Sequence, residues 1–195
     1  LHGVQLGFRP PHVPVYLGAL GPQMLRLAGE AADGAALNWF SPEARVEARE
    51  RVAAGARKAG RDPDSVKLAE YIRVCVDEDV AAARRAYARA TLGYALARPG
   101  ASKDLAYRGH FARMGFGPIL EALEAKRDAG ASMDELADAA PDDLLLAVGY
   151  YGKPEGAGAA FRRVAEGLDI AVVRVVPARP GIESVRAVMQ ACRPS

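Results

Sequence analysis

The sequence places two glycines where a backbone could bind a phosphate group. Gly18, Ala19, Leu20 and Gly21 follow a short apolar segment, and Pro22 opens an amphipathic stretch that is typical of a helix. Small residues let backbone N–H groups approach a phosphate, and the positive end of a helix favours its charge. A Gly-x-x-Gly turn is more often only a tight turn, so the spacing alone leaves both interpretations open.

Two further candidates, Asn38 and Trp39, end the next apolar segment. The amide of Asn38 could donate and accept hydrogen bonds to a bound molecule, and Trp39 could cover one wall of a pocket. For Trp39 the alternative is packing in the core, which is the commoner role of a single tryptophan.

A charged residue, Arg73, stands inside an apolar, β-branched run. A buried guanidinium must be paired or must face a cavity. One hypothesis is therefore that Arg73 contacts an anionic group of a substrate. The alternative, which we favour, is an ion pair with Glu70 or with another interior acid.

His110 lies in a segment of mixed aromatic and basic residues without a clean period. This segment, residues 98–117, is predicted to be the most mobile part of the chain. His110 could titrate in a substrate lid, or it could be a surface histidine on a mobile segment. His2 and His12 predict no site. The sequence offers no Ser/His/Asp set, no metal-ligand cluster and no basic stripe, so no metal or nucleic-acid site is predicted.

The elements that must position these residues alternate along the chain. Strands are predicted at 13–17, 35–40, 66–76 and 170–176, and each is followed by helical sequence. This alternation implies βαβ units and a parallel sheet. Residues from about 98 to 149 have helical patterns but no strand, which predicts an insertion before the last strand. Periodicity does not distinguish half of an eight-stranded barrel, with two exposed sheet edges, from a small doubly wound sheet.

Several helix boundaries follow from local chemistry. Ser41 precedes a proline and an acid, which predicts a capped helix start, and Gly60 predicts its left-handed stop. Ser132 and Glu135 have the spacing of a capping box.

Composition limits the functional classes. The chain has 195 residues, 50% of them hydrophobic, and a net charge of +2, which predicts one globular domain without strong attraction to nucleic acid or to an anionic membrane. No apolar run is expected to span a bilayer, and no basic-then-apolar pattern of a signal peptide is visible after Leu1. Cys75 and Cys192 lack metal-ligand spacing, and unpaired thiols suit a reducing cytoplasm.

One stretch carries a family resemblance. Residues 13–34 read VPVYLGALGPQMLRLAGEAADG. This stretch resembles the fifth strand, phosphate loop, helix and Ala-Asp-Gly turn of luciferase-like monooxygenases and F420-dependent reductases. Three later pieces agree in order: Ala-Gly-Arg-Asp-Pro at 59–63, the strand at 70–76, and the run at 149–155 that leads through a helix to residues 170–173.

The resemblance implies the fold class: an α/β, partial (β/α)8 barrel of the bacterial luciferase-like type, with strands five to eight and a helical insertion at about 98–149. Residues 1–195 would be the C-terminal part of a single barrel domain. The family's hydride-transfer residues would lie upstream of residue 1, so no catalytic residue is predicted in this chain. Lys153 departs from the family, which usually has a capping Asp, Ser or Thr there.

The implied function is that of an F420-dependent oxidoreductase, which moves hydride between a deazaflavin and a small organic substrate. This chain would carry the half that holds the cofactor's phosphate arm. An FMN-dependent monooxygenase is the alternative, because both cofactors present a phosphate and a tricyclic ring. A second alternative is a non-catalytic fragment that folds only with a partner half, and a homodimer also stays open. The implied cofactor residues are Gly18, Ala19, Leu20, Gly21, Asn38 and Trp39, and the implied substrate residues are Arg73 and His110.

Overall fold

The computed structural model describes residue 7, residue 11 and residues 13–193, so His2 and His12 lie outside the described residues. Five parallel strands form one sheet, which confirms the α/β class. The strand β4 was not predicted, and β1 begins at Tyr16 rather than at Val13. The strands are β1 (Tyr16–Gly18), β2 (Gly34–Asn38), β3 (Lys67–Val76), β4 (Gly149–Gly152) and β5 (Ile170–Val175).

The long strand β3 organises the sheet. Arg73 and Val74 pair with both β4 and β5, so these two strands lie on opposite edges of β3. Tyr71 pairs with Asn38 of β2 and with Val172 of β5, so β2 also lies opposite β5. The strands β2 and β4 therefore follow one another along the same edge, and the end of β2 lies beside the middle of β3.

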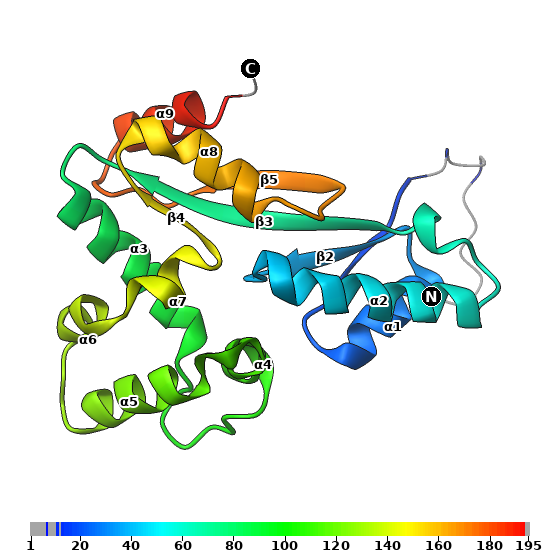
Figure 1. Cartoon of the computed structure of the whole chain (residues 1–195), viewed down its shortest axis with the longest axis horizontal. Helices are drawn as coiled ribbons and strands as arrows, with labels where there is room; N and C mark the ends of the chain where they lie inside the picture. The colour runs from blue at the N-terminus through cyan, green and yellow to red at the C-terminus, as the bar shows by residue number, and fades with distance from the viewer. Residues whose placement is uncertain (1–6, 8–10, 12, 194–195) are drawn as a thin grey trace.

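Four helices pack on one face of this sheet, which we call the outer face: α1 (Pro22–Ala31), α2 (Pro42–Lys58), α8 (Pro154–Val164) and α9 (Ile182–Ala191). Leu68 packs with apolar residues of α1 and α2, and Val74 and Val76 pack with those of α8 and α9. These three residues alternate along β3 and share a face. The twist of the sheet places the two helix pairs above and below it in Figure 1.

The first two helices are held in close contact. A Cβ on Gly29 would lie 2.0 Å from the carbonyl oxygen of Val52, so the backbones of α1 and α2 touch. The hydroxyl of Ser41 accepts a hydrogen bond from the backbone of Ala44, and Gly60 has a φ of +68°. The predicted start and stop of α2 are therefore confirmed.

The opposite face of the sheet, the inner face, is open over much of its length. Tyr71, Ile170 and Val172 project from it and are 49%, 42% and 40% exposed. A shallow cavity of about 150 Å³ lies here, between Tyr16, Tyr71 and Val172. Apolar side chains rarely stay uncovered on a sheet face, so this surface has the character of an incomplete barrel interior.

The stretch after β3 is helical, as predicted. A short 3-10 turn (Pro63–Ser65) precedes β3, and the helices that follow build the lower left lobe of Figure 1. The capping box at Ser132 and Glu135 is confirmed. The elements are α3 (Val80–Ala95), α4 (Ala106–Phe111), a π-helical turn (Ala112–Phe116), α5 (Gly117–Asp128), α6 (Met133–Ala139) and α7 (Asp142–Leu146).

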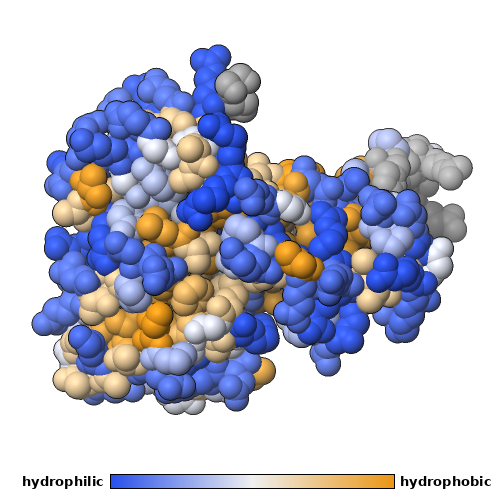
Figure 2. Space-filling model, viewed as in Figure 1, coloured by the Kyte–Doolittle hydropathy of each residue, from blue (hydrophilic) through white to orange (hydrophobic). Residues whose placement is uncertain are grey.

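Figure 2 shows apolar residues reaching the surface mainly over this helical lobe, with hydrophilic residues across most of the rest of the visible face. Within residues 13–193, no helix is both long enough and apolar enough to cross a membrane.

The interpretation of residues 98–117 needs correction. We expected their apolar side chains to be unable to face one core. Phe111 is buried in the cluster of the helical lobe, and Tyr107, Met114 and Phe116 pack against the same cluster. Only Leu105 stays exposed, at 67%. The π-helical turn changes the direction of successive side chains, which a regular period does not describe.

The expected mobility is therefore confined to residues 98–105, which form neither helix nor strand. Amide hydrogen exchange should be fastest in this segment, while α4 should be protected because Arg108, His110 and Phe111 are buried. Exchange of residues 98–105 as slow as that of β5 would contradict this prediction.

Candidate cofactor and substrate site

The glycine turn at 18–21 connects β1 to α1 and leaves the start of the helix open. Gly21 is the N-cap residue of α1, and no side chain caps the first turn, which also contains no acid. The first N–H groups of a helix have no acceptor within it. A Cβ built on Gly18 or on Gly21 would meet no atom of the described residues within 4 Å. The N–H of Ala19 donates to the carbonyl of Ala36 and Pro22 has no N–H, so a phosphate in this space would be held by the other N–H groups at the start of α1.

A cation lies across from this turn. Arg113 of the π-helical turn lines, with Leu20, Gly21 and Gln23, a cavity of about 300 Å³ at the start of α1. Asp104 also lines it, so the charge of the cavity is mixed. The N-terminal end of the helix and Arg113 would both favour a phosphate here.

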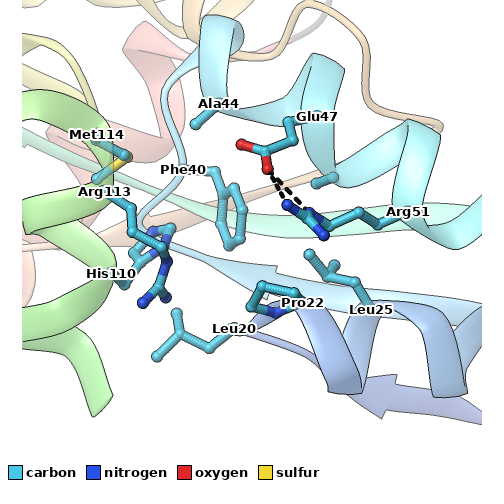
Figure 3. Close-up of a pocket in the computed structure, with 11 residues that line it drawn as sticks. Leu20, Pro22, Leu25, Phe40, Ala44, Glu47, Arg51, His110, Arg113 and Met114 are labelled. Carbon is cyan, nitrogen blue, oxygen red and sulfur yellow. Dashed lines mark hydrogen bonds and ion pairs between the residues drawn. The ribbon is translucent and has the colours of Figure 1, made fainter. Parts of the chain in front are cut away.

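A smaller cavity behind the turn is a packing seam rather than a ligand site. Figure 3 shows Leu20 and Pro22 on one side of it, with His110 and Arg113 on the other and Phe40 between them. Its volume of about 40 Å³ holds little more than one or two water molecules. This seam joins the helical lobe to the start of α1.

Trp39 is held in an uncommon backbone conformation. Its φ is +65°, in the left-handed region, directly after β2. The ring is fully buried and contacts Tyr87, Tyr94 and Phe111. Core packing, the commoner alternative for Trp39, is thus what the structure shows. Non-glycine residues rarely adopt this conformation, and such residues often lie at functional sites.

His110 is buried, not exposed as the surface alternative required. It is 2% exposed, and its Nε2 lies 2.8 Å from the carbonyl oxygen of Trp39. A carbonyl only accepts, so Nε2 donates and carries the proton of the neutral ring. Burial lowers the pKa of His110 to about 4, although the bond to Trp39 opposes this shift. His110 therefore stays neutral near pH 7 and fixes the strained residue at the end of β2.

The structure also corrects the partner of Arg73. Glu70 forms its ion pair with Arg45 of α2 at 2.8 Å, on the outer face. Arg73 instead donates a hydrogen bond from Nη1 to Oδ1 of Asn38 at 2.7 Å. Its guanidinium lies 3.7 Å from the centroid of the Trp39 ring. Because Glu70 and Arg73 are an odd number of residues apart on one strand, they point to opposite faces and cannot pair.

Asn38 connects the sheet to the helical lobe. Its amide nitrogen donates to the hydroxyl of Tyr107 at 2.8 Å, while its oxygen accepts from Arg73. The rings of Tyr94 and Tyr107 meet edge to face, with centroids 4.9 Å apart. The two tyrosines line a cavity of about 420 Å³ with Leu96 and Leu105, which is a volume suited to a small ligand.

The structure thus brings Asn38, Trp39, Arg73 and His110 together where β2 ends beside β3, and the glycine turn lies on the other side of His110. Sequence reasoning missed the residues that complete this arrangement. Tyr94 and Tyr107 belong to the helical lobe, and their aromatic character alone is too general a signal to identify them. The other residues that the sequence did not identify are Arg45, Arg113 and Arg174.

Comparison with known proteins identifies the family that this chain resembles. The model described as Luciferase-like monooxygenase matches residues 1–169. A 5,10-methylenetetrahydromethanopterin reductase of Methanolobus tindarius is 36% identical over 182 residues, which cover 91% of this chain and 52% of that protein. The enzyme of the same name from Archaeoglobus fulgidus is 32% identical over 164 residues, covering 78% of this chain and 48% of that protein. The chain spans about half the length of the curated relatives it matches.

Solved structures agree in fold. The coenzyme F420-dependent tetrahydromethanopterin reductase from Methanopyrus kandleri superposes with a TM-score of 0.69 at 24% identity, over 93% of this chain and 49% of that one. An F420-dependent secondary alcohol dehydrogenase, solved with an F420-acetone adduct, gives a TM-score of 0.61 at 19% identity, over 94% and 50%. These likenesses confirm the partial (β/α)8 barrel.

Proposed function

Because this chain belongs to the luciferase-like monooxygenase family, we propose that it forms the half of an F420-dependent oxidoreductase that holds the phosphate arm of the cofactor. The full site would move hydride between the deazaflavin and a small organic substrate. Two curated relatives are named as reductases, and two structural relatives are described as F420-dependent.

The observation that carries the proposal is the open glycine turn. A phosphate needs several donors close together, and side chains on Gly18 and Gly21 would fill the space that it must occupy. The uncapped start of α1 supplies backbone donors, and Arg113 supplies a cation. These residues therefore fit a cofactor phosphate.

When bound, the deazaflavin would accept or donate the hydride, and the residues of this chain would position it. The glycine turn would hold the phosphate. His110 and Glu70 would hold the backbone at the end of β2, through the carbonyl of Trp39 and the N–H of Phe40. Asn38 would then be positioned to bind the arm or the ring, once Tyr107 moves away from it. The hydride-transfer residues themselves are proposed to lie in the barrel half upstream of residue 1.

The proposal predicts a selective effect of Gly18→Val. The branched side chain should lower F420 affinity at least tenfold, about 1.4 kcal/mol, because it takes the place of the phosphate. Folding should be unaffected, since a Cβ at Gly18 meets nothing within 4 Å and its backbone is not left-handed. Fluorescence titration with F420 measures the loss, and thermal unfolding checks the fold.

Two comparisons make this test specific. Gly18→Ala should lose less affinity than Gly18→Val, because it fills less of the space. A deazaflavin without its phosphate should bind Gly18→Val and the unchanged protein equally. If a normally folded Gly18→Val variant binds F420 as tightly as the unchanged protein, the cofactor phosphate does not bind at this turn.

A second function is favoured by the open inner face. Tyr71, Ile170 and Val172 leave an apolar surface that a complementary barrel half would cover. On this alternative the chain is non-catalytic until a partner half binds it. Sedimentation and thermal unfolding of the 195-residue chain distinguish the two alternatives. A cooperative unfolding transition of a monomer opposes the partner alternative. A chain that is unfolded as a monomer and folds only when it associates supports it.

A further inference from the structure

Two arginines stand side by side on the inner face of the sheet. Arg73 of β3 and Arg174 of β5 are Cα partners in the parallel ladder. Paired residues on neighbouring strands project from the same face and lie about 5 Å apart. Figure 1 shows β3 and β5 running side by side in this part of the sheet. Two positive charges are therefore brought together near the carboxyl ends of both strands.

Neither arginine has an acidic partner among the residues that the structure describes. The other buried arginines do: Arg45 pairs with Glu70, and Arg108 pairs with Glu124. Arg73 is 2% exposed, yet its bonded nitrogen meets only the neutral amide of Asn38, and its Nη2 has no hydrogen-bond acceptor in the part of the chain that the structure describes. Burying an uncompensated cation is expensive, so this exception needs an explanation.

The surroundings of Arg73 hold it in place without neutralising it. The ring of Trp39 lies 3.7 Å from its guanidinium carbon and that of Tyr94 lies 5.1 Å away. Burial lowers the pKa of Arg73, and the nearby Arg174 lowers it further. An arginine nevertheless keeps its proton in proteins. The result is a fixed positive charge, stacked on aromatic rings and next to a second, exposed positive charge.

We propose that Arg73 and Arg174 form an oxyanion subsite, which binds a carboxylate or phosphate group of the substrate. A guanidinium presents paired N–H donors that match the two oxygens of such a group. Arg174 is exposed on the open inner face, so the anion approaches from that side, and the covered Nη2 of Arg73 must turn toward it to complete the pair. The glycine turn belongs to β1, with β2 between it and this pair, so the two anion sites are separate. The assignment to a substrate rests on the proposed function, whereas the anion site itself does not.

The single tryptophan of the chain makes this proposal testable without activity. Because Trp39 stacks on Arg73, an anion that binds the guanidinium should change its fluorescence. We expect a saturable change when inorganic phosphate is added at constant ionic strength. Arg174→Gln should weaken the apparent phosphate affinity by about tenfold, since one of two charge-assisted contacts is lost. Because Arg174 is exposed, this variant should fold normally, and Arg73 is left intact.

A matched control is Arg57→Gln, which removes the same charge from an exposed position on α2. Its phosphate response, followed by the fluorescence of Trp39, should equal that of the unchanged protein. The absence of a saturable response, or equal weakening by Arg57→Gln, would overturn the subsite. If phosphate and F420 bind together, the oxyanion is the substrate's. If F420 displaces phosphate in an Arg174-dependent way, the oxyanion is the cofactor's and the assignment to substrate is overturned.

The two proposals fail separately. If F420 does not bind but the phosphate response depends on Arg174, the proposed function fails and the anion site stands. If F420 binds and Gly18→Val weakens it, but no phosphate response is found, only the oxyanion subsite fails.

Discussion

Replacing Arg45 with methionine should lower the free energy of unfolding by about 3–5 kcal/mol. Arg45 is 2% exposed and donates to the carboxylate of Glu70 and to the carbonyls of Phe40 and Glu166. Its loss leaves Glu70 buried without a counter-charge. Burial already raises the pKa of Glu70, and Arg45 opposes that rise, so the variant should also force Glu70 to take up a proton. Urea unfolding measures the effect.

The same helix supplies a control. Arg51 pairs with Glu47 one turn apart on the exposed side of α2. Arg51→Met should cost less than about 1 kcal/mol, because solvent screens a surface pair. The double variant Arg45→Met with Glu70→Leu should recover part of the loss but not all of it, since the N–H of Phe40 then lacks its acceptor. If Arg45→Met and Arg51→Met lower the free energy of unfolding equally, the buried pair of Arg45 and Glu70 does not stabilise the end of β2.

Acid should destabilise the protein through His110. Burial lowers its pKa in the folded protein from 6.5 to about 4. Above pH 6.5 the ring is neutral in both states. Below that pH the unfolded chain binds a proton that the folded protein does not bind until about pH 4. The free energy of unfolding should therefore fall across this window, by about 3 kcal/mol in all, and then level off.

A variant isolates this contribution. His110→Gln keeps a donor for the carbonyl of Trp39 but does not titrate. The difference in unfolding free energy between wild type and His110→Gln should change between pH 6.5 and pH 4 and be constant above it. Carboxylates titrate in both proteins, so they cancel in the difference. A difference that is independent of pH would mean that His110 is not buried in the neutral form.

The sequence predicted what depends on local chemistry. The start of α2 at Ser41, its stop at Gly60 and the capping box at Ser132 each need only neighbouring residues, and all are confirmed. The glycine turn was found for the same reason. Its phosphate is still a proposal, because a turn of this shape does not require a ligand.

What the sequence left undetermined depends on contacts between distant segments. Arg73 was expected to pair with Glu70, but strand alternation places them on opposite faces, and α2 brings Arg45 to Glu70 instead. For His110 a mobile lid and a surface position were both open, but α4 buries it against the carbonyl of Trp39. The strand β4 is four residues long and rich in glycine and tyrosine, too short for a period to reveal.

A paired titration of the protein with F420 and with FMN, followed by cofactor fluorescence, shows whether this chain binds the deazaflavin in preference to the flavin. Both cofactors carry a phosphate, so the glycine turn serves either, and the comparison isolates the choice of ring system. We expect F420 to bind more tightly than FMN, and Gly18→Val to weaken F420 binding at least tenfold, about 1.4 kcal/mol. Tighter binding of FMN, or F420 binding that is unchanged by Gly18→Val, would contradict this expectation.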